Sequence, residues 1–286
     1  MLLKTLREHF YSSLKEEYPE TEIKSFFNLL SECFLKMKPV EVSLNLYAPI
    51  SGKKTEKFEN AIMRLKNQEP IQYIIGSTEF YGLPFKVTES TLIPRPETEE
   101  LVQWVLDSST SKRENFTILD IGTGTGCIAI SLAKNRSDAT VHAVDISRKA
   151  LTVAKTNAKL NQVDVEFTEL DILNWNSDFE NLKFDVIVSN PPYVRPLEKS
   201  QMSDNVLQHE PSLALFVTDN DPLIFYKKIA EFSKVNLKSK GQLFFEINQY
   251  LGPEMVQLLE DSSFKDVELK KDIFGNDRMV SATKFS

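Results

Sequence analysis

A short polar turn after a buried strand carries the residues best suited to chemistry. The run Phe184–Ser189, mostly β-branched or aromatic, predicts the strand, and Asn190-Pro191-Pro192-Tyr193 follows it directly. The two prolines stiffen the turn and have no N–H, so carbonyl oxygens there stay free to accept hydrogen bonds. Asn190 adds a side-chain carbonyl and Tyr193 a flat aromatic face. Together they could bind a planar –NH2 group, with an oxygen for each N–H and a ring against its π system.

This turn also has a plain structural interpretation, because Asn-Pro is a common turn signal. Upstream, however, further polar residues follow predicted strands in the same way. If these strands are parallel, their carboxyl ends share one edge of the sheet, which is where ligands bind in open α/β sheets. One crevice would then collect, besides the turn, Asp120 with Gly122-Thr123-Gly124-Thr125-Gly126, Asp145 and Asp171.

The glycine-rich loop and the acids around it predict a nucleoside cofactor. The glycines of Gly122–Gly126 let the backbone pass close to a ligand, and the following helix start offers free N–H groups. Asp145 stands at a strand end, where an acid binds ribose hydroxyls. This much fits any such cofactor, NAD included. Asp120, two residues before the loop, would repel a pyrophosphate but suits the α-ammonium of S-adenosylmethionine.

Composition places the chain among ordinary globular proteins. Its 286 residues are 41% hydrophobic and 26% charged, enough for two domains with a full core. A net charge of −7 argues against a chain whose main task is binding nucleic acid backbone, which needs a basic surface. No apolar run is long enough to span a membrane, and Met1–Phe10 has charges throughout, unlike a signal peptide.

The two cysteines, Cys33 and Cys127, offer neither a disulfide framework nor the spacing of metal ligands. We therefore expect buried, reduced thiols, no metal site and a cytoplasmic protein. His142 lies inside a predicted strand and His209 beside Glu210-Pro211, and both are interpreted as structural residues rather than catalytic ones. No oligomer contact is evident, and a monomer is expected.

The hydrophobic period divides the chain into three parts. Residues 1–70 have apolar residues at helical spacing and predict a small helical domain without chemical motifs. From Ile71 onward the pieces Tyr73–Gly76 and Glu79–Val87 are rich in β-forming residues and broken by Gly and Pro. They predict a β-hairpin linker over residues 71–95. Residues 96–286 form the third part.

The stretch Leu92–Glu99 joins the linker to this third part. Pro94 and Pro96 make it extended and stiff, and Glu97 to Glu100 open the next helix at its positive end. It has two interpretations, a helix start with a polar first turn or a fixed strap that could close over a ligand.

Strands and helices alternate over residues 96–286, which predicts an α/β fold with an open, mostly parallel sheet and helices on both faces. Seven strands are expected, and the last two form an antiparallel pair. One helix is expected to begin at Asp221-Pro222, with Asp as the N-cap, and to run to about Leu237. The expected strands are Thr117–Asp120, Thr140–Val144, Val165–Glu169, Phe184–Ser189, Gln242–Ile247, Val267–Lys271 and Arg278–Thr283.

Taken together, these motifs resemble a known family. Asp120–Gly126 with Asn190–Tyr193 is similar to methyltransferases that act on planar –NH2 groups, either adenine amines or glutamine amides. Pro70–Gly76, Leu92–Glu99 and Asn276-Asp277-Arg278 narrow the resemblance to the release-factor glutamine methyltransferases of the HemK/PrmC type. It covers essentially the whole chain and implies a Rossmann-like methyltransferase sheet behind a helical domain that docks the substrate.

The resemblance also implies roles for individual residues. The residues that would bind S-adenosylmethionine are Asp120, Gly122–Gly126, Asp145, Asp171 with Ile172, and Asn190. Asp171 would bind the adenine amine. Asn190, Pro191, Pro192 and Tyr193 would hold and activate the glutamine of a Gly-Gly-Gln loop in a peptide chain release factor. Two positions depart from the family pattern. Asp221-Pro222-Leu223 replaces the more common Asp-Gly-Leu, and Ile172 replaces an aromatic residue, although Trp175 is nearby.

Two other functions use some of the same residues. An adenine-N6 methyltransferase of nucleic acid could use the same four-residue turn, but the acidic chain lacks a basic target-recognition domain. A non-catalytic S-adenosylmethionine sensor would need the glycine loop and would have no use for an amide-binding turn. Glutamine methylation therefore explains more of the sequence than either alternative.

Overall fold

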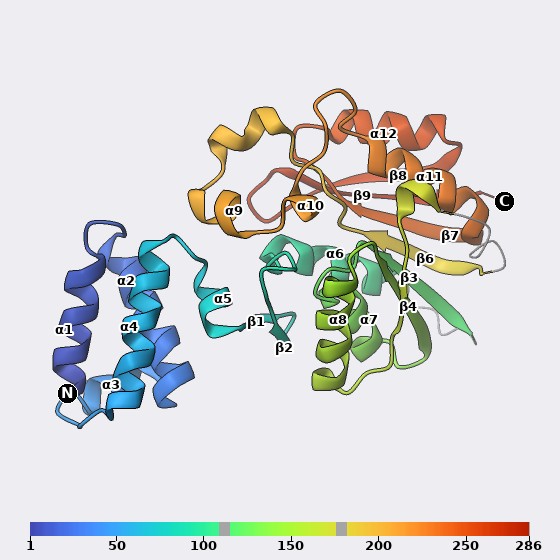
Figure 1. Cartoon of the computed structure of the whole chain (residues 1–286). Helices are drawn as coiled ribbons and strands as arrows, with labels where there is room; N and C mark the ends of the chain where they lie inside the picture. The colour runs from blue at the N-terminus through green and yellow to red at the C-terminus, as the bar shows by residue number, and fades with distance from the viewer. Residues whose placement is uncertain (109–114, 176–181, 286) are drawn as a thin grey trace. The chain divides into compact units, whose positions relative to one another are not determined.

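The chain folds into two compact units in the computed structural model, which describes residues 1–108, 115–175 and 182–285 (Figure 1). The first unit contains Met1–Gly76 together with Ser203–His209. The second contains Ser77–Met202 and Glu210–Ser286.

The first unit is helical, as the apolar spacing predicts. Its core is aromatic: Phe10, Phe27 and Phe58 are all buried, and their ring centroids lie 5.4 to 6.2 Å apart. Pro39 starts one helix at its first turn, where a missing N–H costs nothing. The helices are α1 (Leu3–Leu14), α2 (Glu20–Leu30) with a π-helical turn (Ser31–Leu35), α3 (Pro39–Leu44), α4 (Gly52–Lys66), α5 (Ile71–Ile75) and α9 (Asp204–His209).

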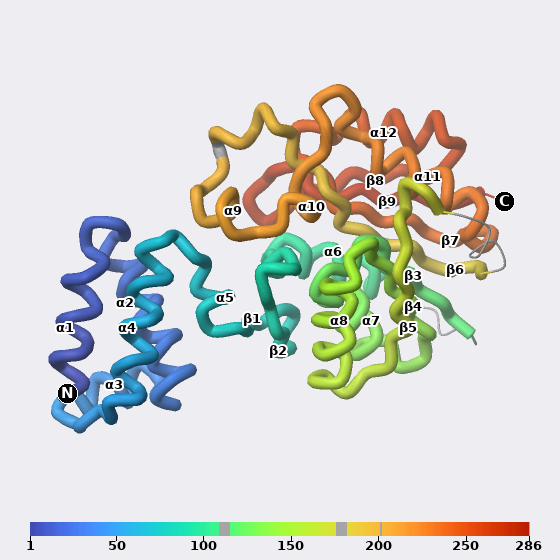
Figure 2. Tube along the Cα trace, in the orientation of Figure 1, coloured from blue at the N-terminus to red at the C-terminus, as the bar shows by residue number. Residues whose placement is uncertain are grey.

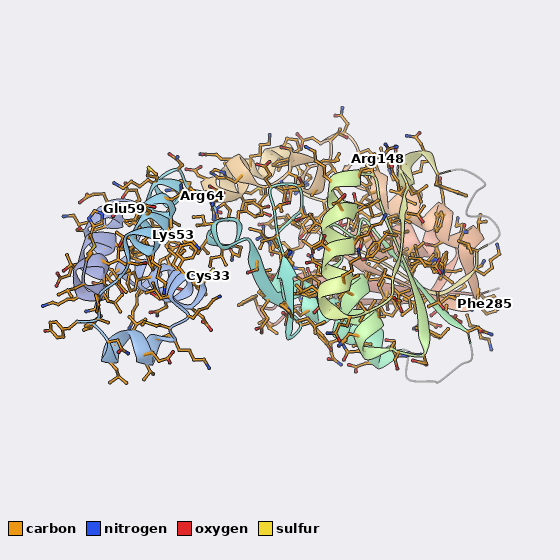
Figure 3. The ribbon with its side chains drawn as sticks, turned by 60° about the horizontal axis from the view of Figure 1, so that its bottom comes forward. Cys33, Lys53, Glu59, Arg64, Arg148 and Phe285 are labelled. Carbon is orange, nitrogen blue, oxygen red and sulfur yellow. The ribbon has the colours of Figure 1, made fainter. Side chains whose placement is uncertain are left out.

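One prediction in this region is wrong. Tyr73–Gly76 was expected as a β piece, whereas Ile71–Ile75 forms α5 and Gly76 ends it at φ +77°. Ile71 and Ile74, three positions apart, both pack into the helical core. Arg64 of α4 donates a hydrogen bond to the Tyr73 carbonyl at 3.3 Å (Figure 3). Packing against α4 therefore outweighs the β propensity of the run.

The hairpin itself is confirmed. β1 (Ser77–Phe80) and β2 (Leu83–Lys86) pair antiparallel, and Tyr81 and Gly82 turn the chain with φ of +52° and +70°. Two positive φ values are what a two-residue hairpin turn requires. Phe80 and Phe85 are buried and anchor the hairpin to the second unit.

The second unit is built on a seven-stranded sheet, as expected, with strand order β5-β4-β3-β6-β7-β9-β8 (Figure 2). β5, β4, β3, β6 and β7 are parallel to one another, and β9 pairs antiparallel with both β7 and β8. The strands are β3 (Phe116–Ile121), β4 (Ala139–Asp145), β5 (Glu166–Glu169), β6 (Phe184–Ser189), β7 (Leu237–Glu246), β8 (Phe264–Lys271) and β9 (Asp277–Lys284).

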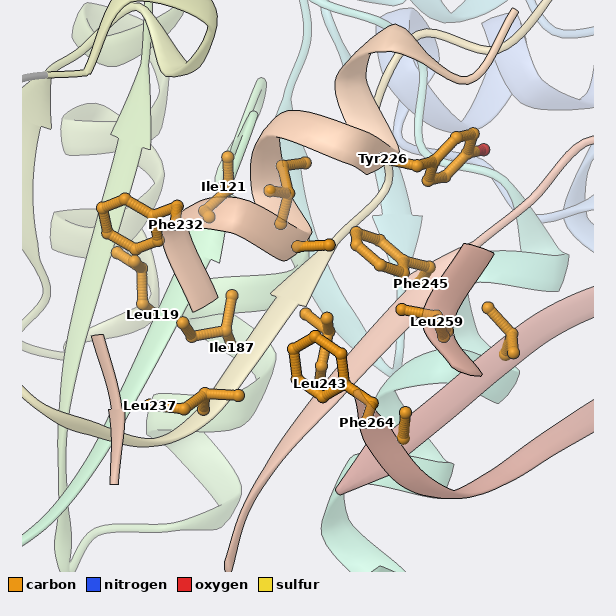
Figure 4. Close-up of a cluster of buried hydrophobic side chains, with 14 of the residues drawn as sticks. Leu119, Ile121, Ile187, Tyr226, Phe232, Leu237, Leu243, Phe245, Leu259 and Phe264 are labelled. Atoms are coloured by element: carbon orange, nitrogen blue, oxygen red, sulfur yellow. The ribbon is translucent and has the colours of Figure 1, made fainter. Parts of the chain in front are cut away.

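Helices cover both faces of this sheet because its strands are apolar on both sides. On one face, Leu119 and Ile187 pack with Tyr226 of α11 and Met255 of α12 (Figure 4). The other face packs against α6, α7 and α8. The long helices are α6 (Pro96–Ser108), α7 (Cys127–Asn135), α8 (Arg148–Asn161), α11 (Ile224–Asn236) and α12 (Gly252–Asp261), and the short ones are η2 (Ile172–Asn174), η4 (Pro196–Gln201) and α10 (Ser212–Leu215).

Three local predictions need correction. The helix expected at Asp221-Pro222 begins at Ile224, after Leu223, and Asp221 only precedes it in a turn. β7 begins at Leu237 rather than Gln242, and Leu237 pairs with Phe184 at the start of β6. Cys33 and Cys127 are free thiols, as expected, but partly rather than fully buried.

Candidate active site

The glycine loop and the Asn190 turn meet where the sheet changes direction. From the central strand β3 the chain runs outward to β4 on one side, and β6 lies on the other side. Ile121 of β3 is in register with Ser189 of β6, so the two strands end level. A Cβ added to Gly122 would lie 3.9 Å from the Asn190 carbonyl oxygen. Predicted cofactor and substrate groups therefore share the switch point of the sheet.

The loop owes its path to its glycines. Gly122, Gly124 and Gly126 have φ of +75°, +55° and +83°, a region that other residues rarely adopt. A side chain at Gly126 would also lie 2.8 Å from Ile130 Cδ1 and 3.2 Å from Ala154 Cβ. Gly126 thus allows α7 and α8 to pack closely, while Gly124 has open space beside its Cα, where a ligand could approach.

Asp120 is buried beneath this loop and is only half satisfied. Its Oδ2 accepts hydrogen bonds from Thr123 Oγ1 at 2.6 Å and from the Ala129 N–H at 3.3 Å. Its Oδ1 has no hydrogen-bond partner among the described residues. Burial raises the pKa of Asp120 to about 7, against the two hydrogen bonds. An unpaired buried carboxylate oxygen is a receptor for a cationic donor such as an ammonium group.

Asp145 connects the end of β4 to the loop. Its Oδ2 accepts from the Gly124 N–H at 2.9 Å and its Oδ1 from the Ser147 N–H at 2.8 Å. Burial raises its pKa, although both hydrogen bonds favour the charged form. Asp145 therefore lies at the end of β4 beside the glycine loop and orders that loop.

Asp171 and Ile172 lie at the end of β5. Asp171 caps the short helix η2, accepting from the Leu173 N–H at 3.0 Å and from Asn174 Nδ2 at 2.7 Å. Ile172 is buried in the core beside Ile121, and Trp175 packs edge-on against Phe232. Trp175 is partly buried and packs against this core rather than standing free.

The turn after β6 is connected to two buried residues that the sequence pattern did not single out. Asn190 Nδ2 donates to Thr98 Oγ1 at 3.3 Å, and Thr98 Oγ1 donates to Glu246 at 2.6 Å. Tyr193 donates its hydroxyl proton to the other Glu246 oxygen at 3.0 Å. Thr98 lies in the first turn of α6 and Glu246 is the last residue of β7. These contacts therefore form only when segments far apart in the sequence are brought together by folding.

A second set of contacts fixes the chain on either side of the turn. Asn248 Nδ2 donates to the Tyr193 carbonyl at 3.1 Å and also reaches Glu198. Glu210, which is buried, accepts from Arg95 at 2.6 Å and from the Ile93 N–H at 3.2 Å. The Pro-rich stretch Leu92–Glu99 is thus tied to the segment that follows the turn.

The two histidines interpreted as structural each contact a neighbouring group. His142 of β4 lies 3.2 Å from Glu166, and His209 contacts the Asn67 carbonyl at 2.7 Å. Among the described residues no cluster of His, Cys, Asp and Glu could hold a metal ion. Searching the same residues finds no helix long and apolar enough to cross a membrane.

Comparisons with known proteins agree with this geometry. Residues 3–76 match the PrmC N-terminal domain, and residues 101–213 match the Methyltransferase small domain. A release factor glutamine methyltransferase of Flavobacterium psychrophilum is 53% identical over 98% of both chains. This chain belongs to the release factor glutamine methyltransferase family. A second family member, from Bacteroides thetaiotaomicron, is 44% identical over 95% of this chain and 96% of its own.

A more distant relative supports the fold alone. The crystal structure of a methyltransferase from Pyrococcus furiosus shares 17% identity with a TM-score of 0.52, covering 80% of this chain and all of that one. The family assignment and the sheet agree that this chain is a methyltransferase.

Proposed function

We propose that this methyltransferase transfers the methyl group of S-adenosylmethionine to the side-chain nitrogen (N5) of a glutamine, in the Gly-Gly-Gln loop of a peptide chain release factor. One observation carries the proposal. The turn Asn190–Tyr193 lies against a glycine loop with an unpaired buried carboxylate oxygen beneath it. The names of the close relatives supply the substrate class.

The residues around the loop fit S-adenosylmethionine, which when bound supplies an electrophilic methyl group on a sulfonium. Asp120 Oδ1 would accept from its α-ammonium, and Gly122–Gly126 would leave room for it to lie against the backbone. Asp145 would accept from ribose hydroxyls and Asp171 from the adenine amine. Both acids already accept backbone N–H bonds here, so they would have to share their oxygens with the cofactor.

The turn would act on the glutamine by orientation. A carboxamide nitrogen is a weak nucleophile because its lone pair is delocalised into the carbonyl. If Asn190 Oδ1 and the Pro191 carbonyl each accept one N–H, the amide is held in one orientation and electron density on its nitrogen increases. Tyr193 would pack on the amide plane and Pro192 would stiffen the turn. Catalysis is then positioning and electrostatic complementarity, with no side-chain base needed before transfer.

The three parts of the chain would have separate tasks. We assign residues 96–286 to catalysis, 71–95 to the hairpin linker and 1–70 to docking of the release factor. A folded protein is the expected partner, because an acidic chain is poorly suited to nucleic acid. The protein would act as a monomer in the cytoplasm.

The first experiment asks for the reaction itself. A purified release factor incubated with the enzyme and S-adenosylmethionine should gain the mass of one methyl group. The same mixture with S-adenosylhomocysteine in place of the cofactor should leave the mass unchanged. An unchanged release factor in both mixtures would contradict the proposal.

A further inference from the structure

Thr98 and Glu246 form a buried hydrogen-bond chain behind Asn190. Thr98 is 2% exposed and Glu246 is 1% exposed, so water cannot replace either contact. Resting on the proposed function, we propose that these two residues are positioning residues that set the direction in which the Asn190 amide points.

The direction follows from donor and acceptor counting. A carboxylate only accepts hydrogen bonds, and a threonine hydroxyl has a single proton. At 2.6 Å, the Thr98 proton is committed to Glu246. The Thr98 oxygen can then only accept a hydrogen bond from Asn190. Asn190 must therefore present Nδ2 to Thr98, which leaves its Oδ1 for a ligand.

This direction matters because both the Asn190 side chain and the target are amides. An inverted Asn190 would point an –NH2 group at the –NH2 group of the substrate, and the two would repel. The two orientations have almost the same shape, so packing alone cannot select between them. The Glu246 carboxylate, an acceptor at the far end of the hydrogen-bond chain, selects one orientation of Asn190.

Neighbouring groups favour the ionised form of Glu246, which accepts from both Thr98 and Tyr193. Burial raises the pKa of Glu246, but the hydrogen bonds from Thr98 and Tyr193 and the positive charge of Arg278 all oppose this shift, while Glu97 adds to it. The backbone carbonyl of Glu246 also accepts from the Tyr226 hydroxyl at 3.1 Å, a contact that involves neither carboxylate oxygen.

Substitution of Thr98 tests the chain without changing shape. Thr98→Val removes the hydroxyl and keeps the branched side chain, whereas Thr98→Ser keeps the hydroxyl. We expect Thr98→Val to lower kcat on the order of 100-fold, the cost of a misoriented reacting group, with KM changed by less than about threefold. Thr98→Ser should keep kcat within about threefold of the unchanged enzyme.

Tyr226→Phe is the matched control, because it removes another buried hydrogen bond to Glu246 that takes no part in the chain. It should lower the melting temperature and leave kcat nearly unchanged. Equal kcat in Thr98→Val and Thr98→Ser would overturn the proposal. So would an equal fall in kcat for Thr98→Val and Tyr226→Phe, because that loss would come from stability alone.

The part of Glu246 is tested with Glu246→Gln. A phenol is a better donor than acceptor, so the new glutamine should keep its oxygen on Tyr193 and turn its –NH2 group to Thr98. Thr98 could then donate to Asn190, and kcat should fall about tenfold or more. In the Thr98→Val background the same substitution should have no further effect. An unchanged kcat for Glu246→Gln, or losses that add in the double variant, would exclude Glu246 from the chain.

These outcomes distinguish a failure of the positioning role of Thr98 and Glu246 from a failure of the proposed function. The proposed function fails if the unchanged enzyme does not methylate a glutamine. If it does, and Thr98→Val matches Thr98→Ser, only the positioning chain fails. Affinity for S-adenosylmethionine, measured by calorimetry, should stay within about threefold in all these variants.

Discussion

Asn190 has two roles that no other residue of the turn combines. Its backbone carbonyl lies beside the glycine loop, and its side chain ends the buried chain from Glu246. The sequence pattern places Asn190 at a strand end and predicts its amide-binding role. The position of polar residues after strands does not identify the partner Thr98, because a threonine in the first turn of a helix normally indicates only a polar helix start.

Asn190→Ala should abolish methyl transfer and leave cofactor binding largely in place. The side chain addresses the acceptor amide, whereas the cofactor residues lie on the loop and at β4. Turnover measured beside isothermal calorimetry with S-adenosylmethionine checks this. Loss of cofactor affinity together with activity, or survival of turnover, would refute the assignment.

Asp120 makes the stability of the cofactor-free protein depend on pH. Its pKa is about 7 in the folded state and near 3.8 in an unfolded chain, so the folded state holds the proton more tightly. The resulting stability is fully present below about pH 4 and is lost as the pH rises through about 7. Asp120→Asn removes this titration. Over that pH range the free energy of unfolding of the unchanged protein should fall by roughly 4 kcal/mol relative to that of the Asp120→Asn variant.

Urea unfolding at a series of pH values measures this difference. Saturating S-adenosylmethionine should reduce the loss in the unchanged protein, because an ammonium group stabilises the ionised carboxylate. A difference between the two proteins that stays constant with pH would show that Asp120 is ionised normally in the fold.

At the scale of elements, the hydrophobic period predicts a helix or strand correctly where contacts with distant residues do not change the local preference. The seven strands follow from apolar runs bounded by acids and glycines, and a hairpin within residues 71–95 follows from β-forming residues broken by Gly and Pro. α5 was missed because Ile71–Ile75 is equally apolar as a strand or a helix. Its fate was decided by contacts with α4, which a local pattern does not contain. The early start of β7 at Leu237 has no local signal for the same reason.

In the candidate site, too, some residues can be found from local sequence pattern and others only from contacts in the folded chain. Asp120, Asp145 and Asn190 are found by their position after strands, since parallel strands bring their carboxyl ends to one edge. Glu246 also follows this rule, at the end of β7, but without a glycine loop or proline turn to draw attention to it. Its meaning depends on Thr98, which lies 148 residues earlier in the chain.

At the scale of the whole molecule, a four-residue turn cannot distinguish one glutamine from another. Discrimination must come from surface outside the turn, and residues 1–70 carry no chemical motif. Among their exposed apolar side chains, Val40 and Leu44 lie one helical turn apart on α3, and Leu44 is 79% exposed. We propose that this exposed apolar pair is part of the surface that docks the release factor.

Val40→Asp with Leu44→Asp should lower kcat/KM on an intact release factor about tenfold or more, by removing apolar contact with the docked protein. Methylation of a short Gly-Gly-Gln peptide should be unchanged, because such a peptide lacks the release-factor surface that would dock on α3. Leu160→Asp on α8 is the control for an exposed leucine outside this domain. Equal losses on both substrates would assign α3 a stabilising task instead of docking.

The proposed reaction places a methyl group on one particular nitrogen. Tandem mass spectrometry of the treated release factor locates that methyl group directly. The account predicts a single added methyl on the side-chain nitrogen of the glutamine in the Gly-Gly-Gln loop. It should be absent when that glutamine is replaced by glutamate and when Asn190→Ala enzyme is used. A methyl group on any other residue, or one that persists with the glutamate-substituted release factor, would contradict the account.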